Sequence, residues 1–319
     1  MRVFHSLEEL ATELGESQNG KTTLGPSVVT IGKFDGIHLG HQQLISATVA
    51  QQKLHGFTSV LVTFDRHPDA VLKPDQLKLP LIGPGQKRDL IEAMGIECLL
   101  VLPFTAELSA MTGQQFVDSV LLGALGAKSI VVGPDFKFGQ GGACDVAELT
   151  KIGDQSGFSV TSITALEIDG RIVSSSAIRQ ALDSGEIKLA NAMLGRVHTT
   201  VGVVEHGLKI GRTIGFPTAN ISREAEGYLP LDGVYAGWLI ADGVRHPAAH
   251  SVGVNETFQA VPRLVESHVI DTLDLDLYDK VVTLEYVDYI RPSVKFNGVE
   301  DLVAEIHRDI AKIKVILGI

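Results

Sequence analysis

The chain has 319 residues, with 27 lysines and arginines against 38 aspartates and glutamates, so its formal net charge is −11. This length predicts about two domains, each large enough to bury its own core. The hydrophobic share of 45% and the charged share of 20% are ordinary for a globular protein and exclude an intrinsically disordered one. Both halves are mildly acidic and neither has a basic stripe, which argues against a nucleic-acid partner held through its phosphates. A small phosphorylated ligand remains compatible, because a local pocket can be positive on an acidic protein.

The cysteines and the apolar runs indicate the compartment. Cys98 lies in an apolar run and Cys144 in a glycine-rich turn, so neither predicts a disulfide framework or half of a metal site. The first residues lead into Glu8 and Glu9 rather than into an apolar signal core, and the longest apolar stretch, 98–104, is too short to span a bilayer. We therefore expect a cytoplasmic protein without a membrane partner.

From residue 27 to about residue 184, short β-branched runs alternate with segments of helical length. The predicted strands are 28–31, 59–64, 98–102, 129–132 and 159–163, and the predicted helices are 42–54, 86–94, 114–125 and 146–155. Continuous apolar strands that alternate with helices predict an α/β domain with a parallel sheet covered on both faces. Such sheets bind ligands beyond the carboxyl ends of their strands.

The pattern changes after residue 195. Strand-like runs at 197–204, 233–240, 248–254, 264–270 and 281–289 follow one another without a helix between them. Short strands in series predict an antiparallel barrel or sandwich. Apolar residues at helical spacing predict one closing helix over 293–317. The domain boundary is expected between Ser184 and Gly195.

Residues 15–22 fit the phosphate-loop pattern G-x-x-x-x-G-K-[ST] letter for letter. That loop binds phosphate only where a buried strand enters it and a helix leaves it. Here the preceding segment 7–14 has helical periodicity, and the following segment 23–26 does not start a helix. We therefore interpret this match as a surface loop.

The segment 32–41 follows the first predicted strand and precedes a helix, where a parallel sheet binds ligands. His38 and His41, three residues apart at a helix start, can both face a phosphate, and Gly40 lets that phosphate approach the backbone. Imidazole donors and the helix dipole can stabilise charge as pyrophosphate departs, while Asp35 can hold Mg²⁺ or orient a histidine. The alternatives are a structural turn and a His-x-x-His metal pair, but a zinc hydrolase is expected to show a glutamate between histidines four apart.

Two later segments of the first domain carry further polar groups. Three serines precede a helix, at Ser174, Ser175 and Ser176. Their hydroxyls can cap the helix or bind a phosphate, and Arg179, about one turn later, can reach the same anion. Asp135 with Phe136 and Phe138 can hold a nucleotide or flavin by polar and stacking contacts, although phenylalanines after a buried strand more often belong to the core.

The second domain carries a glycine-rich segment over 207–220. Its glycines, Gly207, Gly211 and Gly215, are four residues apart and suggest a mobile loop whose backbone can close on phosphates. Lys209 and Arg212 add positive charge. Thr218 and Asn220, two apart in extended chain, point the same way and offer two oxygen ligands to the Mg²⁺ of an ATP complex. A glycine-rich hairpin would explain the glycines alone.

These segments occur in the order found in one enzyme family. G-K-F-D-G-I-H-L-G-H at 32–41, F-D-R-H-P at 64–68, V-G-P-D-F-K-F-G at 132–139 and V-S-S-S-A-I-R at 173–179 resemble motifs of the bacterial bifunctional riboflavin kinase/FMN adenylyltransferase, the bacterial FAD synthetase. G-R-T-I-G-F-P-T-A-N at 211–220 resembles the hallmark of riboflavin kinase, and several later stretches match as well. Arg66 stands where that family has a proline.

The resemblance implies a Rossmann-like nucleotidyltransferase domain at 1–185 and a riboflavin kinase β-barrel with a C-terminal helix at 186–319. It also implies two successive transferase reactions. ATP phosphorylates riboflavin to FMN, and a second ATP then adenylylates FMN to FAD with release of pyrophosphate. The expected partners are therefore the small molecules ATP, riboflavin and FMN, with Mg²⁺ as cofactor.

The resemblance also implies residue roles. Glu266, which alternation places on one strand face with Leu264 and His268, would be the general base of the kinase. The other catalytic residues would be His38, His41 and Arg179. The ATP- or phosphate-binding residues would be Gly32, Phe34, Asp35, Gly40, Ser174, Ser175, Ser176, Lys209, Gly211, Arg212, Gly215, Thr218 and Asn220, the last two also as Mg²⁺ ligands. The flavin-binding residues would be Phe64, Asp135, Phe136, Phe138 and Arg291.

Two other functions remain open at this stage. One is an enzyme with kinase activity only, whose first domain is a flavin- or nucleotide-binding scaffold. The other is a flavin-responsive regulatory protein with both sites silent, although such a protein would be expected to have lost catalytic positions that this sequence retains. Self-association is compatible with either.

Overall fold

The computed structural model describes residues 1–14, 23–66, 79–206, 210–253, 263–272 and 275–319. The chain forms two compact units, the first made of residues 1–79 and 87–172 and the second of residues 80–86 and 173–319. The division expected at residue 185 concerns the two enzymatic domains and stays a prediction.

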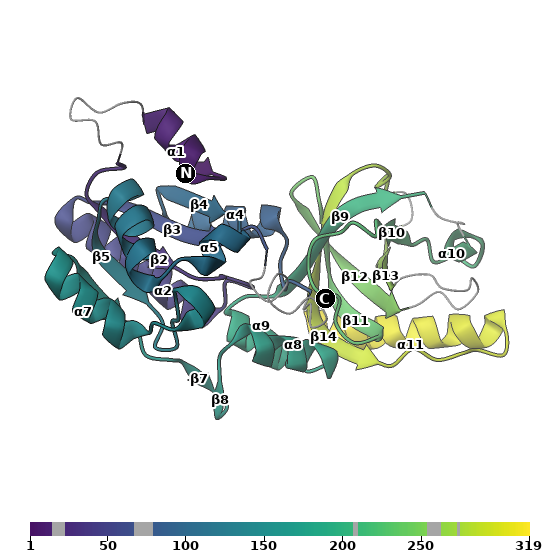
Figure 1. Ribbon diagram of the computed structural model, residues 1–319. Coiled ribbons are helices and arrows are strands. Elements are labelled where there is room, and N and C mark those ends of the chain that lie inside the picture. Colours follow the sequence, from purple (N-terminus) through teal and green to yellow (C-terminus); the bar gives the residue numbers. More distant parts are fainter. Residues whose placement is uncertain (15–22, 67–78, 207–209, 254–262, 273–274) are drawn as a thin grey trace. The chain divides into compact units, whose positions relative to one another are not determined.

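The first unit contains a six-stranded sheet in which all neighbouring strands are parallel, in the order β1-β4-β3-β2-β5-β6 (Figure 1). The strands are β1 (Arg2–Phe4), β2 (Ser27–Ile31), β3 (Thr58–Phe64), β4 (Cys98–Leu102), β5 (Ala127–Val132) and β6 (Ser159–Ser162). The predicted parallel sheet is confirmed. The edge strand β1 was not predicted, because its three residues form a strand only by pairing with β4.

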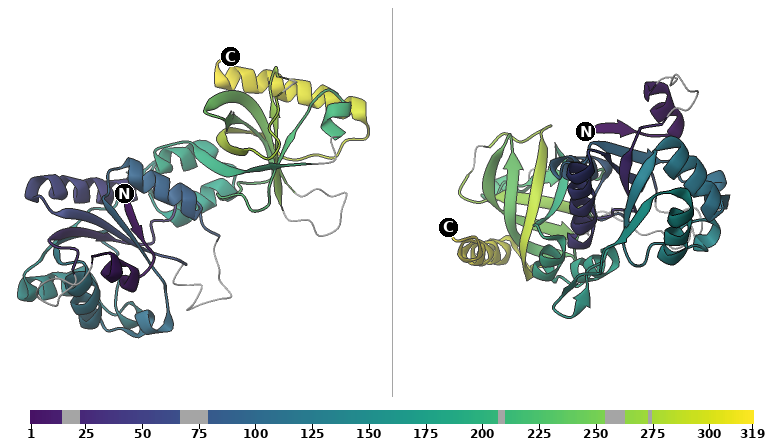
Figure 2. Two further views of the ribbon diagram at one scale, coloured as in Figure 1. Left: turned by 90° about the horizontal axis from the view of Figure 1, so that it is seen from above. Right: turned by 90° about the vertical axis from the view of Figure 1, so that its left-hand side faces the viewer.

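Helices cover both faces of this sheet, which is why its strands are continuous apolar runs. They are α1 (Leu7–Leu14), α2 (Leu39–His55), α4 (Pro84–Ala93), α5 (Ala106–Ala110), α6 (Gly113–Phe116), the π-helix η2 (Val117–Ala124), the short 3₁₀-helix η3 (Gln140–Gly142) and α7 (Val146–Ser156). Right-handed crossovers place α2 and α4 on one face and α1, η2 and α7 on the other, as the left view of Figure 2 shows. A hairpin of β7 (Glu167–Ile168) and β8 (Arg171–Ile172) follows β6.

The order of the strands determines where this sheet can bind a ligand. From β2 the chain moves to β3 on one side and later to β5 on the other, so β2 and β5 flank the switch point of the sheet. Their carboxyl ends lead into the segments 32–38 and 133–139, which hold the predicted phosphate and flavin residues.

The predicted surface loop at 15–22 lies outside the described residues. The segment before it, α1, is a helix as expected, so the phosphate-loop pattern lacks the strand that it requires.

The second unit is built around a closed barrel of the order β10-β13-β12-β11-β14-β9 (Figure 1). Its strands are β9 (His198–Glu205), β10 (Ala219–Ile221), β11 (Gly233–Ala241), β12 (Val244–Gly253), β13 (Leu264–Val269) and β14 (Val281–Arg291). Its helices are α8 (Ser175–Asp183), α9 (Ile187–Leu194), α10 (Ile210–Thr213) and α11 (Val299–Leu317). The barrel, one of the two predicted alternatives, is confirmed.

Two element boundaries differ from the prediction by four residues or more. Strand β12 begins at Val244, four residues before the predicted start, because Asp242 and Gly243 adopt φ values of 51° and 77° and join β11 to β12 in a tight hairpin. An Asp-Gly pair is a strong hairpin signal. Helix α11 begins at Val299 rather than at residue 293.

Helix α11 is attached to the barrel by an apolar seam and an ion pair. Ile313 is fully buried against Ala236 and Ile270. Arg291, at the end of β14, forms an ion pair of 2.8 Å with Asp309 of α11, whose side chain is 4% exposed. Arg291, a predicted flavin-binding residue, therefore also helps to attach α11 to the barrel.

Replacing Asp309 with alanine should lower the free energy of unfolding of the protein by ~3–5 kcal/mol, because the guanidinium of Arg291 would stay buried without its main partner. Urea unfolding followed by circular dichroism measures this loss. The exposed Lys312→Ala on the same helix serves as the control, and equal stability of the two variants would contradict the structural role.

Two of the buried histidines of the barrel, His198 and His250, are almost completely withdrawn from solvent. The Nδ1 of His250 lies 3.0 Å from the Ser267 hydroxyl and its Nε2 lies 3.1 Å from the Glu285 carbonyl. The Nε2 of His198 lies 2.7 Å from the Tyr228 carbonyl. Burial lowers the pKa of each ring to about 4, so both rings are neutral in the folded protein near pH 7.

The barrel should therefore lose stability as the pH falls from about 6.5 to about 4. In this window the unfolded chain binds protons at both histidines, whereas the folded barrel does not. Melting temperatures at constant ionic strength test this, with the exposed His55→Asn as a control and His250→Asn expected to flatten the pH dependence. An unchanged slope in His250→Asn would exclude His250 as its source.

Candidate active sites

The first candidate site begins with a loop in an unusual backbone conformation directly after β2. The Gly32 amide donates to the Val62 carbonyl at 3.1 Å. Phe34 and Ile37 then adopt φ values of 47° and 41°, with Gly36 between them at 86°. Such values are costly for a β-branched residue. The side chains of Phe34 and Ile37 are buried at 0% and 1% exposure, so packing in the core holds the loop in this shape.

This loop presents the two predicted histidines together at the start of α2. The Nδ1 of His38 accepts a hydrogen bond from the His41 amide at 3.3 Å, so His38 caps the helix. The two rings stack with their centroids 3.6 Å apart. A Cβ at Gly40 would lie 3.3 Å from the His38 ring, which leaves little room for a side chain there. Because the Nδ1 of His38 is an acceptor, its proton lies on Nε2 when the ring is neutral.

His41 is half-buried, and its buried Nδ1 is an unused nitrogen. Within the described residues, its Nδ1 has no hydrogen-bond partner. Burial lowers the pKa of His41 well below its usual value, and the neighbouring His38 and Lys87 lower it further. His41 is therefore a neutral imidazole near pH 7. A buried polar atom of this kind is costly unless a ligand completes its bonding.

Sequence reasoning missed Lys87, a residue of α4 that reaches the same loop. Its Nζ donates to the Lys33 carbonyl at 3.0 Å, and its charge interacts with both Asp35 and His41. No sequence signal distinguishes this lysine, because its helix carries several charged residues at ordinary spacing.

The predicted flavin residues of the first unit differ in exposure. Phe136 and Phe138 stack with centroids 5.6 Å apart, but Phe138 belongs to the hydrophobic core while Phe136 is half-buried. Asp135 is exposed, and Phe64 is half-buried with its ring edge-to-face against Phe104. Asp135, Phe136 and Phe64 are thus the members of this set that a ligand can reach, and Phe138 supports Phe136 from behind.

The serine and arginine motif forms the start of α8 in the second unit. The Ser174 hydroxyl accepts a hydrogen bond from the Ala177 amide at 3.2 Å and caps the helix. Ser175 and Ser176 occupy its first turn. Arg179 is 9% exposed, and its Nη1 lies 3.4 Å from the Ser175 carbonyl. The role of these residues in phosphate binding stays a prediction.

The second candidate site begins with a tight turn of the glycine-rich segment. The Phe216 amide donates to the Gly211 carbonyl at 2.8 Å, and a Cβ at Gly211 would lie 2.3 Å from the Phe216 oxygen. Only glycine fits this approach. Gly215 has a φ of 88°, which also favours glycine. Lys209 and Gly207 lie outside the described residues.

Beyond this turn, three predicted residues come together. The Thr218 hydroxyl donates to the Glu266 carboxylate at 3.3 Å. Asn220 is paired directly with Glu266 across β10 and β13, and paired residues share a face of the sheet. Burial raises the pKa of Glu266, and the bond from Thr218 opposes part of that rise. The arrangement gives a carboxylate with increased basicity beside two neutral oxygen ligands.

His268 holds this region in place. Its Nδ1 lies 2.8 Å from the Pro217 carbonyl, and the Phe216 ring packs against it edge-to-face with centroids 5.4 Å apart. Strand alternation already placed His268 on the face of Glu266, but its bond to Pro217 was not foreseeable from spacing.

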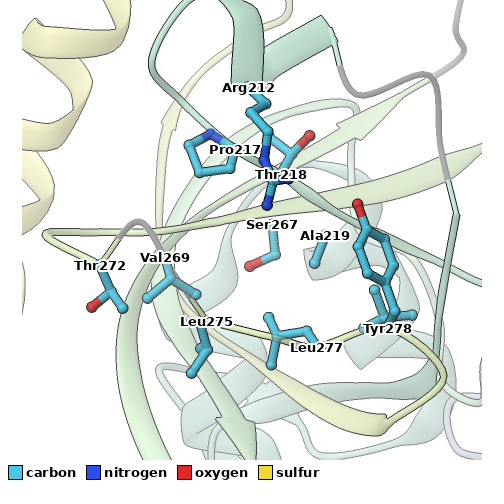
Figure 3. A pocket seen from close by; sticks show the side chains of 11 residues that line it. Arg212, Pro217, Thr218, Ala219, Ser267, Val269, Thr272, Leu275, Leu277 and Tyr278 are labelled. Carbon is cyan, nitrogen blue, oxygen red and sulfur yellow. The ribbon is translucent and has the colours of Figure 1, made fainter.

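A pocket lies next to Thr218 at the end of the barrel. Figure 3 shows Arg212 and Thr218 on one side of it and the apolar Leu275 and Leu277 on the other. Ser267 of β13 also lines the pocket, so its neighbour Glu266 belongs to the opposite face of that strand. Thr218 therefore stands between the pocket and the carboxylate.

The metal-binding capacity of the second site is small. Among the described residues, no three His, Cys, Asp or Glu side chains are grouped so that they could hold a metal ion. Thr218 and Asn220 offer two neutral oxygens, whereas Mg²⁺ takes six ligands. These two residues fit Mg²⁺ only if phosphate oxygens and water supply the remaining ligands, as in an ATP complex.

Two family models match the chain, FAD synthetase over residues 20–177 and riboflavin kinase over residues 194–317. The bifunctional riboflavin kinase/FMN adenylyltransferase of Listeria monocytogenes is 36% identical over 286 residues, which cover 88% of this chain and 90% of that protein. The enzymes of the same name from Bacillus subtilis and Escherichia coli K12 are 34% and 32% identical, and they cover 89% and 88% of this chain and 90% of each relative.

One solved structure is similar over nearly the whole chain. It is titled a macrolide-efflux protein from Streptococcus pneumoniae, with a TM-score of 0.85 and 31% identity, and covers 94% of this chain and 97% of that one. Within the part of the chain that the structure describes, no helix is both long and apolar enough to cross a membrane. The two matching models and the curated relatives together show that the chain belongs to the family of bifunctional riboflavin kinase/FMN adenylyltransferases.

Proposed function

We propose that the chain makes FAD from riboflavin in two ATP-dependent steps, with the kinase reaction at Thr218, Asn220 and Glu266 and the adenylyltransferase reaction at His38 and His41. The observation that carries the proposal is the bond from Thr218 to the half-buried Glu266 opposite Asn220. The set combines a base and two oxygen ligands within one face of a barrel whose family is riboflavin kinase. Because both reactions consume ATP, we place the enzyme in the cytoplasm.

In the kinase step, Glu266 accepts the proton of the ribityl hydroxyl as that oxygen attacks the γ-phosphorus of ATP, whose bond to the β–γ bridging oxygen breaks so that ADP leaves. The raised pKa of Glu266 strengthens the carboxylate as a base at neutral pH. Thr218 and Asn220 would hold Mg²⁺, which neutralises phosphate charge during transfer. Arg212 adds positive charge on the pocket side of Thr218, and Gly211 and Gly215 let the backbone approach the phosphates.

In the adenylyltransferase step, the FMN phosphate attacks the α-phosphorus of a second ATP and pyrophosphate leaves. The phosphate is already ionised near pH 7, so no general base is needed. His38, His41 and the first amides of α2 would donate hydrogen bonds to the departing charge. Neutral rings can do this through one N–H each. We propose that Ser175, Ser176 and Arg179 bind a phosphate of ATP, and that Asp135 and Phe136 contact the flavin.

The test is to incubate the purified chain with riboflavin, ATP and Mg²⁺ and to separate the flavins by chromatography. FAD formation supports both steps. FMN alone would leave a kinase with a binding scaffold, and unchanged riboflavin would point to a regulatory protein. A parallel reaction with EDTA tests the need for a divalent cation.

Replacing both His38 and His41 with alanine should lower the formation of FAD from FMN by at least ~10²-fold, because donors to the developing charge are lost. The rate of FMN formation from riboflavin should stay at the parental level. The matched control is His55→Ala, an exposed histidine on the same helix. A double variant that makes FAD at the parental rate would remove the pair from the mechanism.

Replacing Glu266 with glutamine should lower riboflavin phosphorylation by ~10²–10⁴-fold, because the amide still accepts the Thr218 bond but cannot take the proton. In the parental enzyme, the kinase rate should fall on the acid side with an apparent pKa above the usual range of a glutamate. In Glu266→Gln this acid limb should disappear. The control is Glu205→Gln, an exposed carboxylate paired with Asn220 from β9.

Both turnovers should be measured on one folded preparation of Glu266→Gln, with the melting temperature recorded. Near-normal kinase turnover would exclude Glu266 as the general base of the kinase reaction. An equal loss of both activities would instead assign Glu266 a structural role.

A further inference from the structure

Lys87 is a cation of the first unit that the mechanism above does not use. It lies 46 residues after His41 in the sequence, on α4, yet its Nζ reaches the Lys33 carbonyl at 3.0 Å. The side chain is half-buried, and this partial burial lowers the pKa of Lys87, while the negative charge of Asp35 opposes that shift. Most lysines keep the ammonium group in water, whereas Lys87 uses it to bind a backbone carbonyl of the loop.

The Lys33 carbonyl is held by two donors at once. The Thr63 hydroxyl of β3 donates to it at 3.0 Å from the side of the sheet, and Lys87 donates from α4. Thr63 is 1% exposed, so its hydroxyl cannot exchange the Lys33 carbonyl for a water molecule. Directly after this carbonyl the chain turns through Phe34 and Ile37 with positive φ. The two bonds therefore hold the start of the strained loop that ends at His38.

Charge gives Lys87 a second connection to the site. His41 is neutral, and its buried Nδ1 has no hydrogen-bond partner among the described residues. The charged or titratable groups that act on this environment are His38, Lys87 and Asp35. Of these, Lys87 supplies the positive charge. A neutral imidazole donates one hydrogen bond, but a polyphosphate with several negative charges also requires a cation nearby.

We propose that Lys87 is a positioning residue of the adenylyltransferase site, which holds the Lys33 carbonyl and brings the fixed positive charge for a polyphosphate to the loop of His38 and His41. The inference rests on the proposed role of that histidine pair. In the adenylyltransferase reaction, the group that Lys87 attracts is the polyphosphate of a nucleoside triphosphate or the pyrophosphate that leaves.

The experiment compares four variants of the full-length chain in the adenylylation of FMN, with the kinase reaction measured on the same preparation. Lys87→Met removes the charge and one bond to the carbonyl, while Lys87→Arg keeps the charge. Thr63→Val removes the other bond and leaves the charge. Arg88→Met removes an exposed cation one residue away, which is paired with Asp89.

We expect Lys87→Met to raise the KM for ATP in adenylylation about tenfold and to lower kcat by about the same factor, as the loss of a charged hydrogen bond implies. Lys87→Arg should recover most of the KM. Thr63→Val should lower kcat with little change in KM, and Arg88→Met should match the parent. Affinity for pyrophosphate, measured by calorimetry at two salt concentrations, should fall and lose salt dependence in Lys87→Met.

Each outcome decides between the assignments. Parental adenylylation in Lys87→Met would overturn the role of Lys87, and His41→Ala in the same assay shows whether the site assignment itself stands. If His41→Ala is also active, the proposed site is wrong. If Lys87→Met is unstable, Lys87→Arg and the pyrophosphate titration decide. A KM for ATP in Lys87→Arg about tenfold above that of the parent and of Thr63→Val would contradict the role of the charge.

Discussion

Both candidate sites depend on sharp turns of the backbone that only close packing can hold. After β2, Phe34 and Ile37 have positive φ although neither is glycine, and their side chains are buried. Before β10, the Gly211 backbone and the Phe216 carbonyl approach too closely for any side chain. In each case the core or the turn stabilises a conformation that the isolated peptide would avoid. The packing that holds each turn therefore also positions the functional groups that follow it.

Burial has opposite chemical consequences at the two sites. It lowers the pKa of His41 and raises the pKa of Glu266, because in both cases the charged form is disfavoured. The first effect gives a neutral hydrogen-bond donor, and the second gives a carboxylate with increased basicity. The chain has a net charge of −11, so attraction for ATP has to come from local cations such as Lys87 and Arg212.

Several residues of the family motifs serve the fold as well as the reaction. Ser174 caps α8, and Phe138 lies in the core behind Phe136. Arg291 joins β14 to α11 through Asp309. A loss of activity after replacing such a residue does not by itself indicate contact with a ligand, so variants at these positions need a stability control.

The sequence by itself determined the alternation of strands and helices, the switch from an α/β to an all-β pattern near residue 195, and the motifs that indicate the family. These features depend on local periodicity and on residue types within short segments. It also predicted that His38 and His41, or Thr218 and Asn220, would act together, because their spacing is short.

Only the tertiary structure decided the remainder. Strands β1 and β10 have three residues each and exist through pairing with β4, β9 and β13. The choice of a closed barrel over a sandwich required the pairing of β9 with β14 and β10. The approach of Lys87 to Lys33, and of Asp309 to Arg291, joins segments with no common local pattern. Such contacts arise from the packing of distant elements, and one sequence carries no periodic signal for them.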